Sequence, residues 1–153
     1  MHRDDRDLLH AMPVFGGVSD DALEFLMRLV DVRSVAPGYY FFHEGEDAVS
    51  MFVIQDGQAA VLKSMQGGEL EIDRLNQGDC FGEMALLDLY PRSCSIKALS
   101  PCRIIEIGQS ALFKLYEYNL EQFTIIQMNI GREISRRLRL SGEKLFQARQ
   151  EQR

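Results

Sequence analysis

The sequence predicts an α+β fold, an antiparallel β-roll of the jelly-roll type with helices before it and a long helix after it. Three observations favour this architecture. Apolar residues recur at helical spacing only near the two ends of the chain, at 1–31 and 109–153. Between them, residues 32–108 contain short apolar or alternating runs, with glycine turns about every ten residues. Six to eight short strands of this kind are typical of a closed or double-sheet roll.

The N-terminal segment is expected to be helical. Residues 4–12 place apolar side chains on one side of a first, weak helix. Ser19 is a suitable N-cap for a second helix. Asp20 and Asp21 follow it in the first turn, where negative charge favours the helix dipole.

The predicted roll is built from short strands that end at turn signals. Asp56-Gly57 and Gly67-Gly68 are typical of hairpins, and Ser100-Pro101 breaks the last strand pair. The predicted strands are 39–42, 51–54, 58–63, 70–72, 95–99 and 102–107.

The C-terminal segment predicts a short helix over 110–118 and one long helix over 120–149. A helix of 30 residues spans about 45 Å, which is longer than a roll of this size. Its apolar stripe consists of Phe123, Ile126, Ile130, Ile134, Leu138 and Leu145. Part of this stripe must find a partner beyond the roll, and a second copy of the same helix is the simplest one, so we expect a homodimer.

The composition is that of a globular protein. At 153 residues the chain is expected to form one domain with three parts: an N-terminal helical segment at 1–31, the roll at 32–108 and C-terminal helices at 109–153. Hydrophobic residues make up 46% of the chain and charged residues 26%, which excludes a disordered chain. No apolar run approaches the ~18 residues of a membrane span, and the N-terminus lacks a signal-peptide core. The expected compartment is the cytoplasm, with no membrane association.

The formal net charge of −6 is unevenly distributed. Residues 132–153 contain seven Lys or Arg and three Asp or Glu, a difference of about +4, so the remainder carries about −10. This excludes a nucleic-acid binder that uses the whole chain. We interpret the basic run as a solvated helix face, with a surface for nucleic acid or an acidic partner as the alternative.

The sequence contains no pattern that indicates an enzyme. Cys80, Cys94 and Cys102 form no CxxC pair, and we interpret them as reduced, small hydrophobic residues. His43 is the one histidine inside the roll, whereas a metal site of the cupin type needs several converging ligands. Ser93 and Ser95 have no histidine nearby in the sequence to act as a base. We therefore expect no catalytic residue, no metal and no cofactor.

The segment Cys80–Ser95 carries residue types that suit an anion beside a hydroxyl group. Gly82 permits a tight turn and a close approach of the backbone to a ligand. A short helix starting at Glu83 would point its first free N–H groups outward. Arg92 adds a fixed positive fork and Ser93 a hydroxyl. Glu83 would repel a phosphate, but it can accept a hydrogen bond from a sugar hydroxyl.

These residues resemble the cyclic nucleotide-binding domain family. The resemblance runs from about Phe15 to Leu145. In that family the corresponding block is a phosphate-binding cassette, set into a β-roll between N-terminal and C-terminal helices. The matching residues are Gly45, Gly57, Gly78-Asp79, Phe81-Gly82-Glu83 with Ala85, and Arg92-Ser93. The resemblance implies cAMP or cGMP as the ligand.

The resemblance also implies roles for individual residues. Glu83 would accept a hydrogen bond from the ribose 2′-hydroxyl. The backbone N–H groups of Met84 and Ala85, presented by Gly82, would hold the cyclic phosphate. Arg92 would neutralise the phosphate charge. Ser93 would add a hydrogen bond. The complete predicted ligand set is Gly82, Glu83, Met84, Ala85, Arg92, Ser93 and Ser141.

The stretch from Arg136 to Lys144 is most similar to the bacterial catabolite-activator branch of the family. In that branch a Thr-Ser pair of the dimer helix contacts adenine. Here the pair is Ser141-Gly142, so one hydroxyl is missing and the choice between cAMP and cGMP stays open. Regulators of that branch continue into a helix-turn-helix domain, for which this chain leaves no residues, so DNA binding is not expected.

The sequence thus leads to the hypothesis of a stand-alone cyclic nucleotide sensor. Ligand binding would reposition the C-terminal helix, and an unknown downstream protein partner would receive the signal. Two alternatives remain open. The chain could be a ligand-free β-roll interaction module, or a regulatory fragment of a larger transcription factor, channel or kinase.

Overall fold

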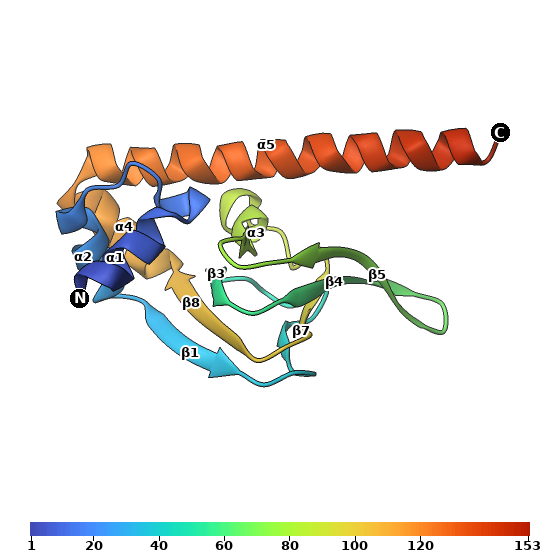
Figure 1. Cartoon of the computed structure of the whole chain (residues 1–153), viewed down its shortest axis with the longest axis horizontal. Helices are drawn as coiled ribbons and strands as arrows, with labels where there is room; N and C mark the ends of the chain where they lie inside the picture. The colour runs from blue at the N-terminus through green and yellow to red at the C-terminus, as the bar shows by residue number, and fades with distance from the viewer.

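The fold is a β-roll of two four-stranded antiparallel sheets, with helices at one end and a long helix running across it (Figure 1). It is seen in a computed structural model that describes residues 1–84 and 87–153. The helices are α1 (Arg3–His10), η1 (Pro13–Phe15), α2 (Asp20–Met27), α3 (Glu83–Asp88), α4 (Gln109–Tyr118) and α5 (Leu120–Glu151). The strands are β1 (Asp31–Val35), β2 (Tyr40–Phe42), β3 (Ser50–Asp56), β4 (Ala59–Met65), β5 (Gly68–Leu75), β6 (Cys80–Phe81), β7 (Ser95–Ala98) and β8 (Cys102–Gly108).

The order of the strands confirms the predicted fold class. One sheet has the order β1-β8-β3-β6 and the other has the order β2-β7-β4-β5. Neighbouring strands are antiparallel in both sheets, and the β4–β5 hairpin closes at the predicted Gly67-Gly68 turn. β1, over Asp31–Val35, was not among the predicted strands. Most of its residues are exposed, so it shows neither the apolar run nor the clean alternation that marks a strand.

A cluster of aromatic side chains fills the space between the two sheets. Phe42, Phe52 and Phe81 come from three different strands, and the rings of Phe52 and Phe81 stack with their centroids 5.1 Å apart. Ile54 and Ile104 are fully buried in the same cluster. Phe81 directly precedes Gly82, so this core anchors the entrance to the candidate binding segment.

A second apolar core joins the helices to the β3–β8 sheet. Val53 and Ile105 lie on the opposite face of their strands from Ile54 and Ile104, and they pack against the helical end of the molecule. Ser19 caps α2 as expected, because the N–H of Ala22 donates to the Ser19 Oγ at 3.2 Å.

The first half of α5 belongs to this second core. Ile126 and Ile130 are buried in it. Asn129, also buried, donates from its Nδ2 to the carbonyl oxygens of Val14 at 3.0 Å and Gly16 at 2.8 Å. The amide therefore fixes α5 to the N-terminal segment. Four of the six residues of the predicted apolar stripe pack within the same chain, namely Phe123, Ile126, Ile130 and Ile134.

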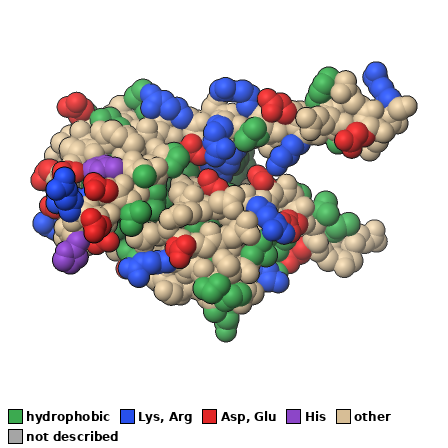
Figure 2. Space-filling model, in the orientation of Figure 1, with side chains coloured by type: hydrophobic (Ala, Val, Ile, Leu, Met, Phe, Trp, Pro, Cys, Tyr) green, Lys and Arg blue, Asp and Glu red, His purple; other side chains and the backbone are tan. Residues whose placement is uncertain are grey.

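The second half of α5 extends past the roll and above the β4–β5 hairpin (Figure 1). Leu138 is 73% exposed, Leu145 is 57% exposed and Phe146 is 63% exposed. A hollow separates this part of α5 from the roll, and Lys and Arg side chains gather along the helix (Figure 2). Of the predicted apolar stripe, Leu138 and Leu145 are thus exposed, and both lie in the distal half of α5.

Candidate functional site

The predicted cassette lies between the roll and α5. β6 pairs with β3 through Phe52 and Phe81, and the chain then turns sharply at Gly82 into α3. Gly82 has a φ of +81°, in the left-handed region that favours glycine. A Cβ built there would come within 2.6 Å of the Arg92 Nη1. This turn therefore requires a glycine for both its conformation and its contact.

A cavity of about 580 Å³ opens between the cassette, the β4–β5 hairpin and α5. Its size is within the range of small-molecule sites. Strand residues such as Val61 and Ile72 provide an apolar wall, whereas the cassette and α5 provide charged groups. Of the predicted ligand set, the residues that line it are Gly82, Glu83, Met84, Arg92, Ser93 and Ser141.

Arg92 is held as a buried cation at the base of this cavity. It is 6% exposed, and its guanidinium lies over the Phe42 ring with the Cζ 4.0 Å from the centroid. Nη1 donates to the Gly82 carbonyl at 2.9 Å, and Nη2 donates to the Ser50 carbonyl at 2.7 Å. Burial lowers the pKa of this guanidinium, but an arginine remains protonated in proteins. The cassette thus carries a desolvated positive charge that cannot titrate near neutral pH.

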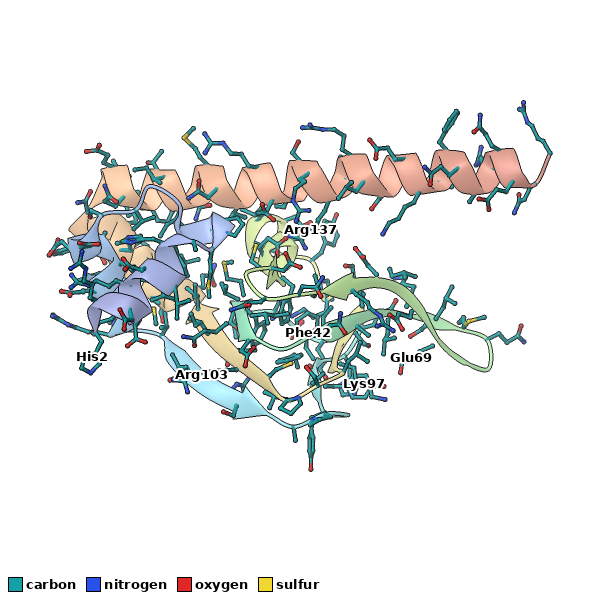
Figure 3. The ribbon with its side chains drawn as sticks, in the orientation of Figure 1. His2, Phe42, Glu69, Lys97, Arg103 and Arg137 are labelled. Atoms are coloured by element: carbon teal, nitrogen blue, oxygen red, sulfur yellow. The ribbon has the colours of Figure 1, made fainter. Side chains whose placement is uncertain are left out.

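Glu83 is the buried anion of the same cavity. It is 2% exposed, and its Oε1 accepts a hydrogen bond from Arg137 on α5. Figure 3 shows Arg137 between α5 and the cassette helix α3. An ion pair with one fully buried member is sensitive to loss of its partner, because the remaining charge would be left without compensation. The Glu83–Arg137 pair therefore couples the cassette to the long helix.

Two polar atoms in this cavity lack a hydrogen-bond partner among the described residues. They are the Oε2 of Glu83, an acceptor, and the Nε of Arg92, a donor. A buried polar atom without a partner is costly, and in a native structure it indicates a missing water, ion or ligand. The orphan acceptor and the orphan donor thus both belong to residues that line this cavity.

The remaining predicted ligand residues lie at the edge of this site. Ser93 is exposed, and its carbonyl accepts a hydrogen bond from the Lys63 Nζ at 2.6 Å. Met84 is 52% exposed at the start of α3. Ser141 is exposed on the face of α5 that lines the cavity. The prediction for Ala85 lies outside the described residues.

Three further side chains of this cavity were missed by the sequence reasoning. Arg137 lies in the stretch that resembles the catabolite-activator branch, but an arginine on a basic helix carries no signal of a buried partner. Lys63 on β4 also lines the cavity. Lys144 does so as well, and its Nζ lies 3.5 Å from the Asp73 Oδ1 on β5. Each pairs with a residue far away in the sequence, which no local motif reveals.

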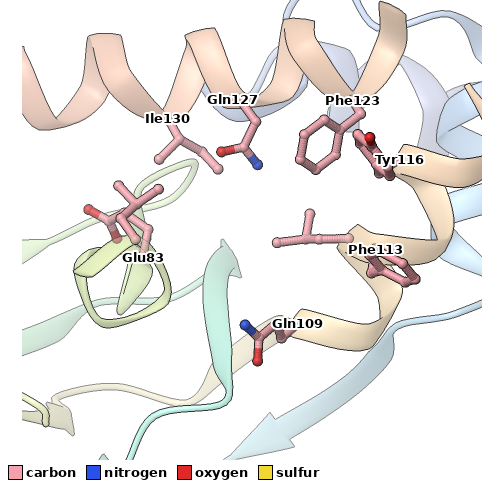
Figure 4. Close-up of a pocket in the computed structure, with 9 residues that line it drawn as sticks. Glu83, Gln109, Phe113, Tyr116, Phe123, Gln127 and Ile130 are labelled. Carbon is pink, nitrogen blue, oxygen red and sulfur yellow. The ribbon is translucent and has the colours of Figure 1, made fainter. Parts of the chain in front are cut away.

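A second, more apolar cavity of about 450 Å³ lies on the other side of the cassette helix (Figure 4). It is bounded by α4 and the first half of α5, and Phe113, Tyr116 and Phe123 form its aromatic wall. Among its described lining residues there is no lysine or arginine. This cavity is therefore unsuited to an anionic ligand, whereas the first one has the charge for it.

The cysteines are free, and the two in the cassette segment hold their protons. Burial, and then the nearby Glu83 carboxylate, raises the pKa of Cys80 to about 12. Burial also raises the pKa of Cys94. A thiol is nucleophilic only as a thiolate, so neither side chain is activated at neutral pH. Within the described residues, no three metal-binding side chains converge, and no helix is long and apolar enough to cross a bilayer.

The roll, the long helix across it and the charged cavity define a β-roll with a cavity in the size range of small-molecule sites. A model of the family described as the cyclic nucleotide-binding domain matches residues 32–119, which is more than half of the chain. The chain belongs to the cyclic nucleotide-binding domain family. This confirms the predicted family, and the matched segment contains the whole cassette.

Two curated relatives are regulators. The cAMP-activated global transcriptional regulator CRP of Salmonella typhimurium is 30% identical over 129 residues, which cover 83% of this chain and 60% of the relative. The cAMP-dependent protein kinase regulatory subunit of Hypocrea atroviridis is 28% identical over 109 residues, which cover 71% of this chain and 23% of the relative. The chain thus spans only part of the length of these relatives.

Solved structures show the same fold. A cyclic nucleotide-binding domain from Methylobacillus flagellatus superposes with a TM-score of 0.83 at 20% identity, covering 93% of this chain and 80% of the other. The catabolite activator protein of Thermus thermophilus gives a TM-score of 0.74 at 23% identity. The match covers 89% of this chain and 62% of the other. At these identities the likeness concerns the fold alone.

Proposed function

We propose that this chain is a cyclic nucleotide sensor, which binds cAMP or cGMP in the cavity between the cassette and α5. Family membership supports a cyclic nucleotide as the ligand class. The role is regulatory rather than catalytic, since binding and release of such a ligand require no nucleophile or base. We place the protein in the cytoplasm, as one domain composed of the segments 1–31, 32–108 and 109–153.

The observation that carries this proposal is the pair of unsatisfied buried atoms. A cyclic phosphate is an anion with acceptor oxygens and no proton to donate at neutral pH, which matches the Nε and the charge of Arg92. A ribose 2′-hydroxyl can donate a hydrogen bond, which matches the Oε2 of Glu83. A cyclic nucleotide carries both groups and would satisfy both atoms at once.

The other cassette groups have supporting roles in this proposal. Ser93 offers its hydroxyl to the phosphate from the rim of the cavity. The backbone N–H groups of Met84 and Ala85 remain predicted phosphate donors. Ser141 faces the cavity from α5 and is the predicted contact for the base.

The signal would pass through α5. Glu83 binds Arg137 with one carboxylate oxygen and leaves the other for the ligand, so nucleotide and helix share one side chain. A ligand shifts the equilibrium between helix positions only to the extent that it binds one of them better. In this proposal a homodimer formed through the distal half of α5 passes the change to a downstream protein partner.

The test is calorimetric titration of the wild type with cAMP, cGMP, 2′-deoxy-cAMP and 5′-AMP. We expect binding of at least one cyclic form, at least tenfold tighter than 5′-AMP. The 2′-deoxy ligand should bind about tenfold more weakly, because it leaves the Glu83 Oε2 unsatisfied. In Glu83→Gln the difference between cAMP and 2′-deoxy-cAMP should shrink.

Thermal unfolding provides an independent measurement of nucleotide binding. A nucleotide at 100 times its Kd stabilises the folded state by about 2.7 kcal/mol, which raises the Tm by roughly 5–10 °C in a chain of this length. No shift with either cyclic nucleotide at millimolar concentration would refute the proposal. If Glu83→Gln lost the same affinity for cAMP and for 2′-deoxy-cAMP, the proposed contact between Glu83 and the ribose would be refuted.

A further inference from the structure

The charges that line the nucleotide cavity are unevenly compensated. Its lining contains four cations: Lys63, Arg92, Arg137 and Lys144. The two cations of α5 are paired with acids of the same cavity, Arg137 with Glu83 and Lys144 with Asp73. Arg92 is buried, and it has used two of its three nitrogens on carbonyl oxygens. Lys63 differs from all of these, because its partner Glu44 lies outside the lining of the cavity.

The position of Lys63 follows from the register of β4. Residues two apart on a strand face the same side, so Val61 and Lys63 both point into the cavity. The Lys63 ammonium lies at the cassette end, where its Nζ donates to the Ser93 carbonyl at 2.6 Å. It is thus adjacent to the residue whose hydroxyl is predicted to meet the phosphate.

Glu44 holds this ammonium in place. Its Oε1 accepts from the Lys63 Nζ at 2.7 Å, and its Oε2 accepts from the Ser64 N–H at 3.0 Å. The Glu44 N–H in turn donates to the Ser95 Oγ at 2.9 Å, so both its backbone and its side chain are fixed. The hydrogen bond from Lys63 and those from Ser64 lower the pKa of Glu44 to about 2, which keeps it ionised across the neutral range.

The ammonium has one donor left over. A lysine ammonium carries three N–H groups, and two of them are used on Glu44 and Ser93. The side chain is 49% exposed, so the third N–H is accessible from the cavity. This is a pre-positioned, charged donor that is accessible to solvent, whereas Arg92 is 6% exposed.

We propose that Lys63 is a phosphate-binding residue of this site, whose ammonium is held by Glu44 against the Ser93 carbonyl and donates its third N–H to the cyclic phosphate. The inference rests on the proposed function and adds a second cation to it. Arg92 supplies a buried positive charge from the cassette. Lys63 supplies a solvent-accessible positive charge from the β4–β5 hairpin.

The test compares Lys63→Met, which keeps the aliphatic stem, with Lys63→Arg, which keeps the charge. Lys97→Met is the matched control, because Lys97 lies on the neighbouring strand β7 and is absent from the described lining of the cavity (Figure 3). Binding of cAMP and cGMP is titrated at several concentrations of NaCl. We compare the affinities for whichever of cAMP and cGMP the wild type binds more tightly. Lys63→Met should bind it about tenfold more weakly than the wild type does, and the affinities of Lys63→Arg and Lys97→Met should stay within about threefold of the wild-type value.

The salt dependence separates a charge from a merely structural role. Because salt screens an accessible ion pair, Lys63→Met should show a flatter dependence of affinity on NaCl than the wild type. Glu44→Gln keeps the ammonium and removes a negative charge, so it should not flatten the slope. Unchanged affinity in Lys63→Met, or a weaker affinity with the wild-type slope, overturns the inference and leaves the sensor proposal standing. A wild type that binds neither nucleotide overturns both.

Discussion

Gly82 decides the geometry of the cassette at the scale of a single residue. Its positive φ lets the chain turn from β6 into α3, and its missing side chain leaves room for the Arg92 guanidinium. The guanidinium then donates back to the Gly82 carbonyl. Glycine and arginine thus define each other's positions, although ten residues separate them in the sequence.

We predict that Gly82→Ala is destabilising and impairs nucleotide binding. The left-handed backbone costs about 1–2 kcal/mol for any other residue, and the new Cβ displaces Arg92. Urea unfolding should show a loss of about 2 kcal/mol, and calorimetry a fall in affinity of at least tenfold. Gly131→Ala is the control, because a Cβ there meets open space on α5, outside the lining of the cavity, and should stabilise the protein by about 0.5–1 kcal/mol. Equal stability and equal affinity in the two variants would contradict this account.

The sequence predicts most of the cassette, because its information is local. Gly82, Glu83, Arg92 and Ser93 lie within twelve residues, and their chemistry indicates both a phosphate and a sugar hydroxyl. Their environment is not local. The two carbonyl oxygens that hold Arg92 belong to Gly82 and Ser50, and the ring beneath it belongs to Phe42. Only the closure of the roll brings these groups together.

At the scale of elements, α5 is joined to the cassette by the pair of Glu83 and Arg137. The carboxylate is almost completely buried, whereas the arginine side chain remains 27% exposed. Removing the arginine would leave a buried charge with one acceptor oxygen already unsatisfied. The pair therefore affects both the stability of the ligand-free protein and the position of the helix.

We predict that Arg137→Met lowers the free energy of unfolding by about 1–3 kcal/mol, a range reduced from that of fully buried pairs because water reaches Arg137. Combining it with Glu83→Gln should recover part of this loss, because the uncompensated charge is then absent. The four proteins of this double-mutant cycle are compared by urea unfolding. Arg139→Met is the control, since Arg139 is exposed on the same helix and donates to the Ser135 hydroxyl rather than to a buried carboxylate, so its removal should cost less than about 1 kcal/mol. Additive effects of the two substitutions would argue against the coupling.

The apolar stripe of α5 shows why an element can be predicted more reliably than its surroundings. The spacing of Ile126, Ile130, Leu138 and Leu145 identifies the helix, which extends two residues beyond the predicted end, to Glu151. The spacing does not say which residues pack within the chain. The structure divides the stripe, because Ile126 and Ile130 are buried whereas Leu138 and Leu145 are exposed. The length of the roll beneath the helix determines where this division falls.

At the scale of the whole molecule, the distal half of α5 is the surface that a second copy is expected to cover. Leu138 and Leu145 are seven residues apart and therefore lie on one side of the helix. Charged substitution of Ile130, in contrast, would disrupt the protein's own core. Dimer formation is thus best probed at the exposed pair.

We predict that the wild type is dimeric and that Leu138→Glu combined with Leu145→Glu makes it monomeric. Apposed glutamates repel each other, and the apolar area that drives association is lost. Sedimentation equilibrium at about 10–100 µM should show the change, and the circular dichroism of the variant should retain the helix and strand signals. Gln147→Glu, at another exposed position of α5, should remain dimeric. A monomeric wild type in this range, or a dimeric double variant, would contradict the prediction.

The buried amide of Asn129 gives α5 the geometry of a lever. At 1.5 Å per residue, this anchor lies about 12 Å from Arg137 and about 33 Å from Glu151 along the helix axis. If the helix tilts about the anchor as a rigid rod, a displacement of 1 Å at Arg137 becomes nearly 3 Å at Glu151. Arg137 lies beside the candidate ligand cavity and Glu151 lies at the end of the helix. A small displacement at the cavity would therefore become a larger one at the tip of α5.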